Sequence, residues 1–111
     1  MKRIAIALTL VLTSFSAWSY DGNDLYDWAK LYEAGKTKNL WYGFYTGYVS
    51  ATTHYTNALG AVCPPSTTRD GQIFDIVHDY VKSHPAKRTD DASVLIVNAL
   101  QEAYPFRNES S

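Results

Sequence analysis

Hydrophobic and polar residues follow the period of an α-helix along most of the chain. In the segment "NDLYDWAKLYEAG", apolar side chains recur at the i, i+3, i+4 and i+7 positions of a helix, at Leu25, Trp28, Ala29 and Tyr32. Asn23 is a suitable N-cap, and Gly35 is a suitable residue to end the helix. The pattern therefore predicts a first helix between Asn23 and Gly35.

A longer second helix is predicted from about Lys38 to Leu59, because no strand-like alternation lasts in this segment. Its expected apolar face consists of Leu40 or Trp41, Phe44, Tyr48, Ala51 or Thr52, Tyr55 and Leu59. Gly43 and Gly47, followed by Ala51, form a ridge of small residues at helical spacing. We expect the last helix to pack closely against this ridge.

The third helix is predicted to begin at Thr67 or Thr68, where Thr67 and Asp70 resemble a capping box. It ends at His84, because the residue before a proline is disfavoured in a helix. Its expected buried side contains Ile73, Val77, Tyr80, Val81 and His84.

The fourth helix starts at Thr89 or Asp90 and ends before Pro105. It has the clearest apolar stripe of the chain, at Ala92, Leu95, Ile96, Ala99, Leu100 and Ala103. Four helices with short connections predict a compact all-α domain, with room for one extra short helix.

The first 19 residues have the pattern of a cleaved export signal. Lys2 and Arg3 precede an apolar run over residues 4–12, and Ala17-Trp18-Ser19 offers a small–x–small cleavage site. The run is shorter than the roughly 20 residues that span a bilayer. We expect cleavage after Ser19, a periplasmic domain over residues 20–106 and a loose tail over 107–111.

The charge of the mature chain argues against nucleic acid as a partner. Removing Lys2 and Arg3 from the 10 basic residues leaves 8 against 11 acidic ones, a net charge of −3. No basic stripe remains that would hold phosphates. No apolar stretch after residue 19 is long enough to span a membrane, so we expect no membrane contact after signal cleavage.

The residue pattern does not predict an enzyme or a metal site. His54, His78 and His84 lack the i, i+4 spacing of a helical metal pair, and no cysteine cluster surrounds them. Cys63 is followed by Pro64 and Pro65, so it lacks the helix N-terminus that would activate a thiol. We therefore expect no catalytic residues, no metal and no cofactor.

Aromatic residues crowd the predicted second helix, where Tyr42, Tyr45, Tyr48 and Tyr55 accompany Trp41. They do not all fit one buried stripe, so some must face solvent. Exposed aromatic side chains are common in binding surfaces, and also occur singly on ordinary surfaces. Tyr42 and Tyr45 are candidate contact residues.

Five segments in order give the chain a resemblance to the Rap/Tai immunity proteins. They are "GFYTGYV", "CPP" with the following Gln72, "IVHDYVKSHP", "ASVLIVNAL" and "AYPF", and they extend from about Asp24 to Phe106. The resemblance implies a small exported helical protein that waits in the periplasm. It also implies a partner, a type VI secretion amidase toxin that cuts peptidoglycan cross-link peptides with a cysteine–histidine site. The immunity protein would plug the cleft of that enzyme.

The chain departs from this family at one position. The resemblance implies a disulfide between the cysteine at Cys63 and a second cysteine after the last helix, where this chain has Phe106. Cys63 is then either a buried thiol under the last helix or available to pair between chains in a homodimer. Burial of the Phe106 ring would offset part of the lost stability.

An inhibitor that plugs a cleft needs a rigid protrusion, because ordering a floppy segment reduces affinity. Two loops qualify by composition: "CPPSTTRDG", which contains Pro64, Pro65 and Arg69, and "SHPAKRTDD", which contains His84, Lys87 and Arg88. We expect the second loop, residues 83–91, to make the main contact.

Two other functions fit the same residues. An HdeA-like periplasmic acid-stress chaperone is also small, exported and helical, but it depends on a disulfide that a chain with one cysteine lacks. A small exported peptidoglycan- or glycan-binding protein would use the aromatic residues of segment 41–55.

Overall fold

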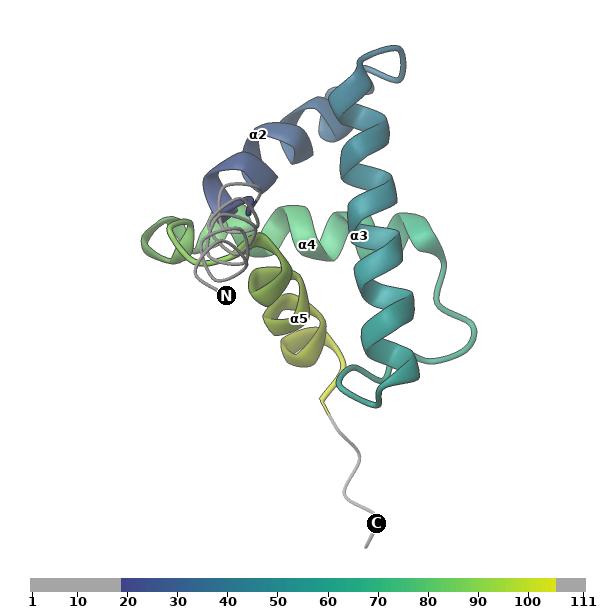
Figure 1. Cartoon of the computed structure of the whole chain (residues 1–111). Helices are drawn as coiled ribbons and strands as arrows, with labels where there is room; N and C mark the ends of the chain where they lie inside the picture. The colour runs from purple at the N-terminus through teal and green to yellow at the C-terminus, as the bar shows by residue number, and fades with distance from the viewer. Residues whose placement is uncertain (1–18, 106–111) are drawn as a thin grey trace, which may run out of the picture.

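The computed structural model describes residues 19–105, which form four α-helices and one short 3₁₀-helix (Figure 1). They are α2 (Gly22–Glu33), α3 (Leu40–Ala58), α4 (Asp70–Ser83), η1 (Pro85–Lys87) and α5 (Ala92–Ala103). Among these residues the only strand-like pairing is a single bridge between Asp21 and Asp91. The predicted all-α domain with one extra short helix is confirmed. Of the predicted signal peptide only Ser19 is described, and Phe106 and the predicted tail lie outside the described residues.

The start of α2 corrects the predicted cap. Asp21, not Asn23, is the N-cap: its carboxylate accepts a hydrogen bond from the Asp24 backbone N–H at 3.0 Å. The Asp24 carboxylate in turn accepts from the Asp21 N–H at 3.2 Å. The reciprocal pair satisfies two backbone donors at once, which a lone Asn23 side chain cannot do.

Two further starts lie later in the chain than predicted. The third helix begins at Asp70 instead of Thr67, because the Gln72 side chain accepts from the N–H of Arg69 at 2.9 Å and Thr68 is held in a turn. The fourth begins at Ala92 instead of Thr89, because the preceding residues pair with the start of α2. The predicted end at Gly35 is confirmed by its positive φ of 69°.

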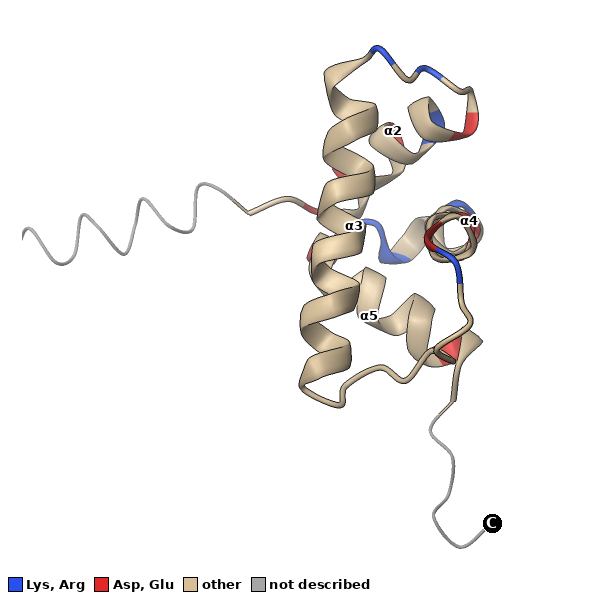
Figure 2. Ribbon diagram, turned by 90° about the vertical axis from the view of Figure 1, so that its right-hand side faces the viewer, with Lys and Arg blue, Asp and Glu red and all other residues tan. Residues whose placement is uncertain are grey.

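Every pair of the four α-helices is in contact, and one core lies between them. Figure 2 looks along α4, with α3 running the length of the domain beside it. The core consists of Leu25, Trp28, Ala29, Tyr45, Val49, Val62, Ile73, Val77, Tyr80, Val81, Ala92, Leu95, Ile96, Ala99 and Leu100. The predicted faces of α2, α4 and α5 are therefore largely confirmed, although His84 is only half-buried, His78 is buried and Ala103 is exposed.

The predicted inner face of α3 is only partly confirmed. Phe44 and Tyr48 are half-buried and pack against the core, but Leu40, Trp41, Tyr55 and Leu59 are exposed. The helix buries Tyr45, Val49 and Thr53, whereas Gly43 and Gly47 face solvent. A side-chain carbon added at either glycine would meet nothing within 4 Å, so the expected small-residue packing ridge does not exist. Two positions along a helix differ by about 200° in direction, so turning Tyr45 inward turns Gly43 outward. Burial of the larger side chains decides the orientation.

The close helix approach lies at a different glycine, Gly22, at the start of α2. Its N–H donates to the Asp90 carbonyl at 2.9 Å, and the Asn23 N–H donates to the Arg88 carbonyl at 2.9 Å. The Ala92 N–H donates to the Tyr20 carbonyl at the same distance. These bonds join the start of α2 to the segment before α5 and hold the 83–91 loop against α2.

No helix within residues 19–105 is both long and apolar enough to cross a bilayer.

Candidate functional site

The most distinctive surface of the domain is the solvent-facing side of α3. The helix spans 19 residues without one Asp, Glu, Lys or Arg, and Figure 2 shows it uncoloured by charge along its length. Its exposed positions include Gly43, Gly47, Ala51 and Tyr55. The cores of protein–protein interfaces have this composition, with few charged residues and many aromatic ones.

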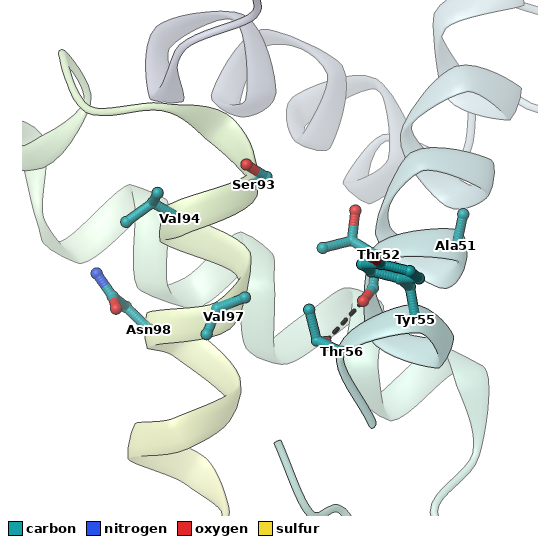
Figure 3. Close-up of a pocket in the computed structure, with 8 residues that line it drawn as sticks. All are labelled: Ala51, Thr52, Tyr55, Thr56, Ser93, Val94, Val97 and Asn98. Atoms are coloured by element: carbon teal, nitrogen blue, oxygen red, sulfur yellow. Dashed lines mark hydrogen bonds between the residues drawn. The ribbon is translucent and has the colours of Figure 1, made fainter. Parts of the chain in front are cut away.

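A groove runs between α3 and α5 on this surface (Figure 3). It encloses about 500 Å³. Ala51, Thr52, Tyr55 and Thr56 line it from α3, and Ser93, Val94, Val97 and Asn98 line it from α5. Tyr55 is 68% exposed and Val94 47% exposed, so large apolar side chains remain open to a partner. The lining has no carboxylate, amine, imidazole or thiol, and its polar groups are the hydroxyl and amide groups common in binding surfaces.

A smaller pocket of about 150 Å³ lies between α3 and the loop that contains Pro64 and Pro65. Its polar lining includes Ser50, His54, Asn57, Ser66, Thr68 and Asp70. The structure thus brings both prolines of the predicted 63–71 loop to one pocket. Arg69 is exposed and does not line it.

The loop is anchored to the fold at its start. Val62 is fully buried, and the Gln101 side chain of α5 donates to the Ala61 carbonyl at 2.9 Å. Cys63 is exposed, so the alternative of a thiol buried under the last helix is wrong. Among residues 19–105, no group of three or more His, Cys, Asp or Glu side chains is placed to hold a metal ion.

The 83–91 loop uses its cations largely within the domain. The Arg88 guanidinium donates to the Val81 carbonyl at 2.7 Å and to the Lys82 carbonyl at 2.9 Å. It also lies 3.9 Å from the centre of the Tyr26 ring. Arg88 therefore caps the last carbonyls of α4 and holds the loop to α2, instead of reaching into solvent as the sequence suggests.

The other two candidates of this loop gather at Tyr80. The His84 ring stacks on Tyr80 with centroids 4.1 Å apart, and its Nδ1 lies 2.8 Å from the Tyr80 carbonyl. Lys87 is exposed, and its Nζ donates to the Tyr80 hydroxyl at 3.3 Å. Of the two predicted contact cations, Lys87 and Arg88, Lys87 is therefore more available to a partner.

The two candidate tyrosines have different surroundings. Tyr45 is 0% exposed and its hydroxyl donates to the Phe74 carbonyl at 2.6 Å, so the prediction that it contacts a partner is wrong. Burial raises the pKa of Tyr45 far above its ordinary value. Tyr42 is half-buried and packs on Tyr32 with ring centroids 5.6 Å apart.

Sequence reasoning missed the exposed apolar residues at the start of α3. Leu40 is 77% exposed and Trp41 40% exposed, although one or the other was expected on the inner face. The Trp41 ring stacks on Trp28 with centroids 5.6 Å apart and planes 5° from parallel. The absence of charge over residues 40–58 was the signal that this helix has two apolar sides.

Comparison with known proteins gives a family match. No curated protein and no solved structure gives a significant match to the chain. The sequence profile of the family described as Rap1a immunity proteins matches residues 21–106, which covers the whole helical domain. The chain belongs to the Rap1a family of immunity proteins.

Proposed function

We propose that this immunity protein is exported to the periplasm, where it binds and inhibits a peptidoglycan amidase delivered by type VI secretion. The family match over residues 21–106 carries the proposal, because it implies binding to a secreted toxin. The export pattern of residues 1–19 supports the location, since a toxin that cuts peptidoglycan acts outside the inner membrane. The motifs from "GFYTGYV" to "AYPF" support an amidase as the target.

The geometry supports a role in binding. The uncharged side of α3 and the groove with Tyr55 and Val94 form one continuous surface of apolar, hydroxyl and amide groups. Removing water from such a surface on binding costs little free energy, because no Asp, Glu, Lys or Arg side chain on it must be desolvated. We place the main contact with the toxin on this surface.

A rescue experiment tests immunity and export together. A candidate peptidoglycan amidase toxin is directed to the periplasm of a sensitive strain, with either the full chain or a chain that starts at Tyr20 expressed alongside. We expect the full chain to restore growth and the chain without residues 1–19 to fail. Equal rescue by both chains would contradict export, and failure of both would contradict immunity against that toxin.

An inhibition assay with purified proteins tests the amidase target and the surface. We expect one equivalent of the mature chain to stop hydrolysis of peptidoglycan cross-link peptides by the toxin. Ala51→Arg places a charge in the groove and should weaken inhibition at least about tenfold. Ala103→Arg makes the same change at an exposed position of α5 outside the groove and should leave inhibition intact. Equal inhibition by both variants would move the contact away from the groove.

A further inference from the structure

The connection between α2 and α3 protrudes at one end of the domain, away from α4 and α5 (Figure 1). It covers residues 34–39 and leads directly into Leu40 and Trp41, the two exposed apolar residues at the start of α3. The loop contains Lys36 and Lys38, and Figure 2 shows basic residues on it in blue. We call residues 34–41 the α2–α3 tip.

The tip is held in one conformation by its own hydrogen bonds. Gly35 has a φ of 69°, and the N–H of Lys36 donates to the Leu31 carbonyl at 3.0 Å, which closes α2 as a Schellman motif. The Asn39 N–H donates to the Lys36 carbonyl, and the Asn39 side chain accepts from the N–H of Trp41, both at 2.9 Å. A segment ordered in this way loses little conformational entropy when it binds.

The positive charges of the tip are not used within the described domain. Lys36 and Lys38 are exposed, and neither forms an ion pair with another residue of 19–105. Glu33, the nearest acidic residue along the chain, has its carboxylate 3.8 Å from the ring of His78 instead. This contrasts with Arg88 of the 83–91 loop, whose guanidinium is held by two carbonyls.

We propose that the α2–α3 tip is a second contact with the toxin, in which Leu40 enters an apolar recess and Lys36 and Lys38 pair with carboxylates on its rim. This inference rests on the proposed function, since the partner is the same protein. The tip adjoins the uncharged side of α3, so both contacts belong to one continuous surface. Charge complementarity favours an acidic recess, because the tip presents two cations and no anion.

A protein partner is favoured over a lipid surface. Two lysines and one leucine are too few to hold a domain on anionic lipid, which usually requires a longer basic cluster or a lipid chain. The net negative charge of the mature chain would further oppose such a surface. A recess on a protein surface, by contrast, can enclose a rigid protruding tip.

Affinity for the purified amidase toxin that the chain neutralises in the rescue experiment tests the inference, by calorimetry at two salt concentrations. Lys36→Glu with Lys38→Glu should raise the Kd at least about tenfold and reduce its dependence on salt. Leu40→Ser should raise the Kd roughly tenfold at both salt concentrations, because an apolar contact is not screened. The matched control, Arg69→Glu with Lys82→Glu, changes the net charge by the same amount at exposed positions outside the tip and should bind like the parent.

Each outcome has a separate meaning. If the parent chain fails to bind the toxin, the proposed function is wrong. If the parent binds and the tip variants bind within about twofold of it, the proposed function stands and the tip is not a contact. Sedimentation with phosphatidylglycerol vesicles is the remaining arm: binding of the parent that is lost in the Lys36→Glu, Lys38→Glu variant would overturn a protein recess in favour of lipid.

Discussion

Replacement of Gly22 by alanine is the sharpest test of the fold, because Gly22 lies where two parts of the domain meet most closely. A Cβ atom at this position would lie 2.7 Å from the Arg88 Cα and 2.9 Å from the Arg88 carbonyl oxygen, and would collide with the Leu95 side chain. The Arg88 backbone cannot move freely, because its carbonyl accepts from the N–H of Asn23 at 2.9 Å.

The magnitude follows from two opposing effects. Alanine is favoured over glycine in a helix interior by roughly 1 kcal/mol, although less at the first helical residue. Overpacking a tight site costs about 1–3 kcal/mol, and a collision with backbone belongs at the upper end of that range. We therefore expect Gly22→Ala to lower the free energy of unfolding by about 1–3 kcal/mol.

Gly47→Ala is the matched control, since it makes the same change within a helix at a position with nothing within 4 Å of the added carbon. At Gly47 only the greater helix propensity of alanine matters, so the free energy of unfolding should rise by about 0.5–1 kcal/mol relative to the parent. Urea denaturation of the mature chain, followed by circular dichroism, measures both variants. A Gly22→Ala midpoint equal to or above that of the parent would refute the close approach of α2 and Arg88.

Two further predictions concern half-buried polar side chains, Arg88 and Tyr32. Arg88→Ala should lower the free energy of unfolding by about 1–3 kcal/mol, because it removes two charge-assisted hydrogen bonds at the end of α4, whereas Lys87→Ala should change it by less than about 0.5 kcal/mol; equal effects in urea denaturation would contradict this. Burial of the Tyr32 hydroxyl, together with the neighbouring Asp75, raises the pKa of Tyr32 to about 12. The neutral hydroxyl therefore contributes its full stabilisation of the fold below pH 10, and this contribution is lost as the pH rises towards 12. The urea midpoint should therefore fall above pH 10, together with the appearance of tyrosinate absorbance, and a constant midpoint would count against it.

The helices predicted best are those with one apolar side. In α5, the stripe from Ala92 to Leu100 leaves only one orientation that buries it, so periodicity alone gives the correct face. The start of α5 was misplaced by two or three residues, because Thr89 is a reasonable cap on local grounds. The backbone bonds that bind this segment to α2 join residues about 70 positions apart in sequence, and no local rule contains them.

Helix α3 was predicted correctly as a helix, but its most buried residues, Tyr45, Val49 and Thr53, were not assigned to the inner face. Its apolar residues surround the helix, so periodicity gives no unique direction. What decides is the volume available between α2 and α4, which accepts Tyr45 with a hydrogen bond from its hydroxyl to Phe74. The glycines that suggested close packing lie on the opposite side, where no other helix of residues 19–105 approaches.

Arg88 and Lys36 show why the sequence does not predict which basic side chains are available to a partner. Arg88 and Lys36 both lie in short polar connections between helices, and each is flanked by turn residues. They differ only in the acceptors that the fold places beside them: the end of α4 presents two carbonyls to the Arg88 side chain, whereas the end of α2 closes through its own backbone bonds and leaves Lys36 in solvent. A planar guanidinium suits two fixed carbonyls, while a flexible ammonium suits a partner that arrives later. The α2–α3 tip therefore presents cations that the domain does not use, whereas the arginine of the 83–91 loop is bound within the domain.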